Sequence, residues 1–104
     1  MVKDMNIDKI EVYNNGKSFI IFPRENKVSL LDRTISITDD EIKDFLRIIR
    51  TWKNEYIDNS YSDGIMFNVK VFYDGKIDEM KGKRAVPDNY EEFSQYVGMI
   101  YDRR

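Results

Sequence analysis

Residues 38–56 read TDDEIKDFLRIIRTWKNEY, and this stretch indicates an amphipathic helix with a defined first residue. Thr38 followed three residues later by Glu41 is a capping box, in which each side chain accepts a hydrogen bond from the other residue's backbone amide. Apolar residues then recur at helical spacing: Ile42, Phe45, Leu46, Ile49, Trp52 and Tyr56. Charged residues take the opposite face: Lys43, Asp44, Arg47, Arg50 and Lys53. The pattern predicts burial of Ile42, Phe45, Leu46, Ile49 and Trp52.

The sequence before this helix has the pattern of an antiparallel meander. Asn15-Gly16 tolerates positive φ at both positions and predicts a two-residue hairpin turn. Segments with strand-like alternation flank this turn and continue to the helix. They predict four short strands, at residues 10–13, 17–22, 27–31 and 34–37.

A second hairpin is predicted after the helix, beyond a polar loop at residues 57–63. Residues 65–73 alternate as a strand, and Asp74-Gly75 supplies another two-residue turn. Residues 76–81 form the returning strand, and their high charge suits the edge of a sheet.

The last third of the chain predicts a loop and a second helix. Residues 81–84, Lys-Gly-Lys-Arg, are typical of a solvated basic loop. Asp88 with Glu91 three residues later predicts the cap of a helix. The apolar face of this helix contains Tyr90, Phe93, Val97, Ile100 and Tyr101.

These elements predict one α+β domain over residues 1–104, with the order ββββ-α-ββ-α. We expect a twisted antiparallel sheet of about five to six short strands with both helices packed on one face. A length of 104 residues suits a single hydrophobic core. The 41% of apolar residues, with only 2 Pro and 5 Gly, is typical of a folded chain.

The composition argues against catalysis. Histidine and cysteine are both absent, which removes the commonest general base, the commonest metal ligand and all thiol chemistry. No serine lies in a nucleophile motif, and the densest acidic cluster, residues 39–41, is explained by helix capping. We therefore expect no enzyme activity, no cofactor and no metal site. No run of about 18 apolar residues is present, so we expect a cytoplasmic protein without a membrane span.

A protein-binding surface is predicted from the middle of the chain. Residues 39–63 carry seven acidic and four basic side chains, although the whole chain has a net charge of only −2. A loop tyrosine can anchor an interface while nearby carboxylates steer it toward a basic partner. The candidate binding residues are Tyr61, Asp58, Asp63, Glu55 and Asp44. The partner expected from this charge is a larger protein with a basic surface.

Two further surfaces are candidates. Lys81, Lys83 and Arg84 form an alternative basic patch suited to phosphate contacts. Acidic neighbours on both sides cancel much of its field, so direct nucleic-acid binding is not expected. The outward face of strand 65–73 carries both apolar and polar side chains, and together with the loop at 57–63 it forms an interface candidate.

A set of residues in the second half of the chain forms a recognisable pattern: Trp52, Tyr56, Asp63-Gly64, Phe67-Asn68-Val69-Lys70-Val71, Asp74-Gly75-Lys76, Gly82 and Pro87-x-Asn89-Tyr90-x-x-Phe93. In these residues the chain resembles small single-domain proteins of low-GC Gram-positive bacteria and their phages. That class includes anti-CRISPR-like inhibitors and toxin-immunity proteins, and it implies a scaffold without a catalytic signature. The chain departs from the class at Lys83-Arg84-Ala85, where members often have an Asn-rich turn.

Three functions are expected from these patterns together with the class that the resemblance implies. The first is a non-enzymatic inhibitor of a larger bacterial protein, in particular a phage-borne anti-CRISPR that blocks an RNA-guided nuclease in the host cytoplasm. The positively charged nucleic-acid channel of such a nuclease would attract an acidic surface. The second is an immunity protein that neutralises a toxin. The third is a small nucleic-acid binder that uses residues 81–84.

Overall fold

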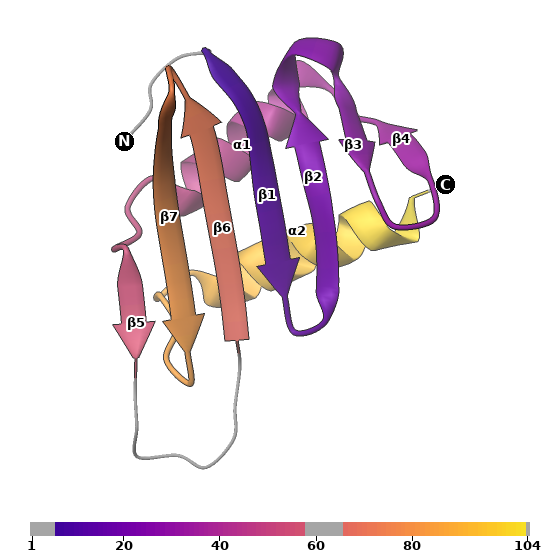
Figure 1. Ribbon diagram of the computed structural model, residues 1–104. Coiled ribbons are helices and arrows are strands. Elements are labelled where there is room, and N and C mark those ends of the chain that lie inside the picture. The colour runs from indigo at the N-terminus through magenta and orange to yellow at the C-terminus, as the bar shows by residue number, and fades with distance from the viewer. Residues whose placement is uncertain (1–5, 58–65, 104) are drawn as a thin grey trace.

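The computed structural model describes residues 6–57 and 66–103 and shows an α+β fold with two α-helices and one seven-stranded sheet (Figure 1). The strand order is β4-β3-β2-β1-β6-β7-β5, and only the β5–β7 pair is parallel. The elements are β1 (Ile7–Asn14), β2 (Lys17–Phe22), the 3-10 helix η1 (Pro23–Glu25), β3 (Lys27–Ser29), β4 (Thr34–Ser36), α1 (Asp39–Ile49), β5 (Glu55–Ile57), β6 (Met66–Tyr73), β7 (Lys76–Lys83) and α2 (Tyr90–Asp102). The predicted α+β class is confirmed.

Both predicted hairpin turns are present. Asn15 and Gly16 have φ values of 46° and 90°, and Asp74 and Gly75 have φ values of 49° and 75°. Positive φ at both central residues is the type I′ geometry, whose twist matches that of the flanking strands. These turns bring β1 against β2 and β6 against β7, while β1 and β6 lie side by side at the centre of the sheet.

Helix α1 begins as predicted but ends earlier than its apolar stripe suggested. The Thr38 hydroxyl accepts a hydrogen bond from the Glu41 amide at 3.1 Å, and the Glu41 carboxylate accepts one from the Thr38 amide at 3.0 Å. The prediction that Trp52 lies on this helix is wrong, because α1 ends at Ile49. Ile42, Phe45 and Ile49 are buried as predicted, whereas Leu46 and Trp52 are only half-buried.

Strand β5 is an element that the sequence patterns did not predict. Tyr56 continues the four-residue spacing of the helix stripe, yet it lies in this short strand and packs against Phe67, with ring centroids 6.2 Å apart. Pairing with β5 places β7 inside the sheet, so the prediction that the charged strand forms an edge is wrong. The predicted loop at 81–84 is also wrong, since β7 extends to Lys83.

Helix α2 begins at Tyr90, within two residues of the predicted start at Asp88. The prediction that Asp88 caps it is wrong, because Asn89 occupies the cap position. The Asn89 side chain accepts a hydrogen bond from the Trp52 indole at 2.7 Å and donates one to the Ile48 carbonyl at 2.8 Å. This residue therefore joins the start of α2 to the end of α1.

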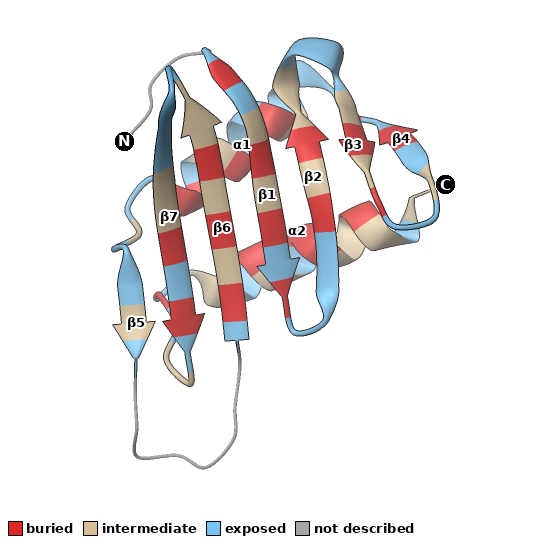
Figure 2. Ribbon diagram, in the orientation of Figure 1, coloured by how far each residue is buried: buried red, intermediate tan, exposed pale blue. Residues whose placement is uncertain are grey.

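The core lies between the helices and one face of the sheet. Both helices cover the same face in Figure 1, and Figure 2 shows buried and less buried residues alternating along the strands. Ile10, Ile21, Val69, Phe45 and Phe93 have essentially no exposed surface. This one-sided covering leaves the opposite face of the sheet, here called the open face, without a packed layer among the described residues.

Candidate interaction face

The open face is built from side chains that alternate with core residues along the strands. Strand pairing aligns them in rows that run across the sheet. One row contains Glu55, Lys81, Asn68, Tyr13 and Ser18. The next contains Glu79, Lys70, Glu11, Ile20 and Ser29. Ile77, Phe72 and Lys9 form a further row, and Phe22 pairs with Lys27 beside it.

Several apolar side chains on this face are exposed. The exposed fractions are 60% for Ile77, 51% for Ile57, 47% for Met66 and 37% for Tyr13. Ile20, Phe22 and Phe72 are half-buried on the same face. Single exposed apolar residues are ordinary, but a group of them on one uncovered sheet face marks a surface suited to binding another macromolecule.

Charged side chains on the open face contact one another. The Lys9 ammonium lies 3.2 Å from the Glu11 carboxylate and 4.7 Å from the centre of the Phe72 ring. Asn68 donates a hydrogen bond to Glu79 at 2.8 Å, and this bond lowers the pKa of the Glu79 carboxyl, with a smaller contribution from Lys70. The ionised form of Glu79 is therefore favoured beside the apolar groups.

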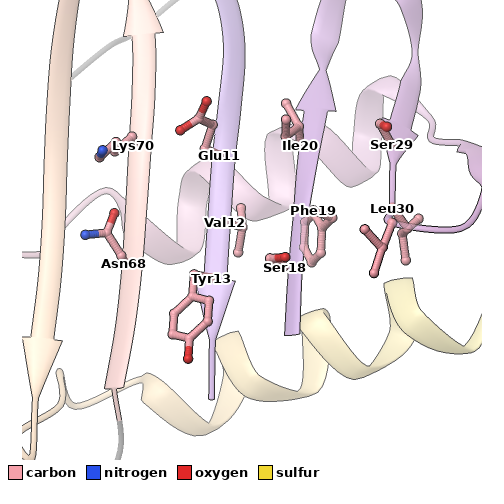
Figure 3. Close-up of a pocket in the computed structure, with 11 residues that line it drawn as sticks. Glu11, Val12, Tyr13, Ser18, Phe19, Ile20, Ser29, Leu30, Asn68 and Lys70 are labelled. Atoms are coloured by element: carbon pink, nitrogen blue, oxygen red, sulfur yellow. The ribbon is translucent and has the colours of Figure 1, made fainter. Parts of the chain in front are cut away.

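A hollow lies over β1, β2 and β3, where the lining includes the short side chains of Ser18 and Ser29 (Figure 3). It has a volume of about 410 Å³. Tyr13 and Glu11 line it from β1, Ser18 and Ile20 from β2, and Leu31 from the turn after β3. Leu31 is fully exposed, so the lining of the hollow includes an apolar side chain that lies in water.

A second hollow of about 300 Å³ shares Tyr13 and Asn68 with the first. Its lining also includes Met66, Ile57 and Lys83. Tyr13 thus lines both hollows near the middle of the sheet, which makes it the central aromatic residue of the open face.

The residues predicted to bind a partner do not form one group among the described residues. Tyr61, Asp58 and Asp63 lie outside the described residues. Asp44 is on α1, where it pairs with Arg47 at 2.7 Å, and Arg47 in turn contacts Glu92 of α2. Glu55 is on the other side of the molecule, in β5 at the margin of the open face.

One acidic candidate, Glu55, meets the basic candidates at one corner of the open face. Glu55 lies opposite Lys81 in the parallel β5–β7 pair, with their charged groups 4.0 Å apart. Lys83 extends from the same end of β7, and Arg84 follows with φ of 66° in a bridge to Ile57. The sequence analysis placed these residues in separate patches, because parallel pairing between distant segments leaves no local pattern in the sequence.

Tyr13, Ile20, Leu31 and Ile77 are residues of this face that the sequence analysis did not single out. The signal that identifies the first two is period-two alternation with their buried neighbours Val12, Phe19 and Ile21. Alternation alone does not tell which face is covered, because that depends on where the helices pack.

The strongest pKa shifts lie in the helix layer and serve structure. Arg103 forms an ion pair with Glu41, and this contact lowers the pKa of the Glu41 carboxyl to about 2. Burial raises the pKa of the Tyr96 hydroxyl, which donates a hydrogen bond to the Glu41 carbonyl at 2.7 Å. In the described part of the chain, no group of three acidic side chains is arranged to hold a metal ion.

Comparisons with known proteins give no family for the chain. No protein-family model, curated protein or solved structure matches it. Over residues 6–57 and 66–103, neither helix combines the length and apolar character needed to cross a membrane.

Proposed function

We propose that this chain is a non-catalytic protein that acts by binding a larger protein through the open face of its sheet. The observation that carries the proposal is the group of exposed apolar side chains on that face, centred on Tyr13. The absence of histidine and cysteine from the whole sequence supports a binding role over a catalytic one.

The class of partner rests on the resemblance of the second half of the chain to small phage and bacterial proteins. Because that class includes inhibitors, the first candidate function is that of a phage-borne anti-CRISPR that blocks an RNA-guided nuclease in the cytoplasm of a bacterial host. A toxin-immunity protein is the second candidate, and it would bind its toxin with similar physics. The two functions differ in the activity that the chain abolishes.

A titration of cleavage activity tests the proposal. Purified chain is added at increasing molar ratio to RNA-guided nucleases loaded with guide, and cleavage of target DNA is measured. We expect one nuclease to lose activity at about one chain per enzyme, since a specific interface saturates stoichiometrically. The same titration against the activity of bacterial toxins tests the immunity function.

Two double variants show whether the open face is responsible. Tyr13→Ala with Ile77→Ala truncates two exposed open-face residues, whereas Lys43→Ala with Glu91→Ala changes exposed residues of the two helices. We expect the first to relieve inhibition and the second to inhibit like the parent chain. Equal inhibition by both would contradict binding through the open face.

A further inference from the structure

The charges of the described residues are divided between the two layers of the molecule. The helices α1 and α2 together carry seven acidic side chains and two basic ones. The open face carries five lysines, Lys9, Lys27, Lys70, Lys81 and Lys83, against the three glutamates Glu11, Glu55 and Glu79. The open face therefore carries two more lysines than glutamates, although one of these lysines, Lys27, also pairs with Glu25 of η1 at 2.9 Å, and the chain as a whole is acidic.

The three glutamates of the open face already have partners on that face. Glu11 pairs with Lys9, and Glu79 accepts a hydrogen bond from Asn68. Glu55 lies 4.0 Å from Lys81. These partners reduce the repulsion between the three glutamates and the carboxylates of a bound protein. The excess of lysine over glutamate would attract those carboxylates over a distance of about a Debye length.

The hollow between Tyr13 and Leu31 supplies the apolar part of such a site. Its lining includes the short side chains of Ser18 and Ser29 and the charged side chains of Lys70 and Glu11. A volume of about 410 Å³ has room for a large apolar side chain. Anchors of this kind dominate the binding energy of protein interfaces, while charged neighbours fix orientation.

We infer that the open face binds an acidic segment of a partner protein, with one apolar side chain inserted into this hollow. The inference rests on the proposed binding function and adds the chemistry of the segment that is bound.

A nucleic acid fits the open face less well. A phosphate backbone lying across the sheet offers no apolar side chain for the hollow between Tyr13 and Leu31. The Phe72 ring, which could stack on a base, is covered by the Lys9 ammonium.

Nuclear magnetic resonance of the isotope-labelled full chain tests the inference with defined probes. The first probe is a peptide of about twelve residues made of Glu and Ser with one central Leu, long enough to span several strands about 4.8 Å apart. Matched probes replace Glu by Lys, or the central Leu by Ser. Single-stranded DNA of similar length tests nucleic-acid binding. Spectra in buffer alone at increasing protein concentration test dimerisation.

We expect the acidic Leu peptide to shift the signals of Tyr13, Ser18, Ile20 and Leu31, and to bind at least about tenfold more tightly than the Lys peptide at about 0.15 M salt. Replacing the central Leu by Ser should weaken binding about fivefold or more, since the apolar anchor is lost. Leu31→Ser and Lys70→Glu should each weaken the acidic peptide by a similar factor, whereas Lys43→Glu on α1 leaves it within about twofold.

Three results would overturn the inference. They are no open-face shifts up to about 2 mM acidic peptide, tighter binding of DNA than of this peptide, or dimerisation that covers the same residues. If the peptide test fails but the Tyr13→Ala, Ile77→Ala double variant still relieves inhibition, the binding function stands and only the acidic segment is rejected. Loss of both would reject the open face altogether.

Discussion

Phe67 and Gly82 lie opposite each other in the β6–β7 pair, and the ring of Phe67 occupies the space that a side chain at position 82 would need. A Cβ atom added to Gly82 would also lie 2.7 Å from the carbonyl oxygen of Ala85. Phe67 itself contacts the ring of Trp52 with centroids 5.1 Å apart, so β7 and the aromatic cluster can approach only because residue 82 is glycine.

Gly82→Ala should therefore destabilise the protein by about 1–3 kcal/mol, because overpacking forces the Phe67 ring or the β7 backbone to move. Urea unfolding followed by circular dichroism measures the change. Gly98→Ala is the matched control, since nothing lies within 4 Å of a Cβ at that helical position. It should raise stability by about 0.5–1 kcal/mol through helix propensity. Equal effects of the two substitutions would contradict the close contact.

Asn89→Ala should cost about 1–3 kcal/mol, because it leaves the half-buried Trp52 indole and the Ile48 carbonyl without their hydrogen-bond partner. Asp88→Ala changes the exposed neighbour that the sequence pattern named as the cap, and it should change stability by less than about 0.5 kcal/mol. Thermal unfolding of both variants compares them directly. A larger loss for Asp88→Ala would mean that the Asn89 contacts do not join the two helices.

The contact between Glu41 and Arg103 predicts a pH dependence of stability. The pKa of Glu41 falls from 4.5 to about 2, chiefly through the hydrogen bond from Arg103. The ionised form is favoured in the folded state, so the stabilisation is complete above about pH 4.5 and is lost as the pH falls toward about 2. Because both side chains are partly solvated, we expect a contribution of about 1–2 kcal/mol at pH 7.

Urea unfolding of the parent chain and of Glu41→Gln at several pH values checks this contribution. The difference in unfolding free energy should be largest at neutral pH and shrink toward zero near pH 2. Arg103→Gln should reduce the pH dependence in the same interval, since it removes the partner. A constant difference at all pH values would show that the ion pair is not its source.

The sequence could predict those parts of the fold that depend on local chemistry. The capping box at Thr38 and the two turns at Asn15-Gly16 and Asp74-Gly75 were found where the residues indicated. Strand β5 was missed because Tyr56 fits the helical spacing, and its pairing with β7 is a contact between distant segments. The same reason explains why Asp88 was preferred to Asn89, whose partners are Trp52 and Ile48.

Less of the candidate site than of the fold could be predicted from the sequence. The outward face of strand 65–73 was identified as an interface candidate, and Met66 and Phe72 do lie on the open face. Its central residue, Tyr13, comes from a strand about fifty positions earlier. Only the strand order β1–β6 brings the two together.

Open-face substitutions should separate binding from stability. Ile77→Thr changes a residue that is 60% exposed, so the free energy of unfolding should change by less than about 0.5 kcal/mol. Ile21→Ala removes a fully buried side chain of the same sheet and should cost about 2–5 kcal/mol. Urea unfolding measures both, and a large loss for Ile77→Thr would show that the open face packs against part of this chain.

The most direct test of the account is a calorimetric titration of the inhibited nuclease or toxin with the parent chain and with the Tyr13→Ala, Ile77→Ala double variant. The account predicts one binding site for the parent chain, and for the double variant a dissociation constant at least about tenfold higher with an almost unchanged unfolding temperature. Equal dissociation constants for the two proteins would contradict the claim that this chain acts through the open face of its sheet.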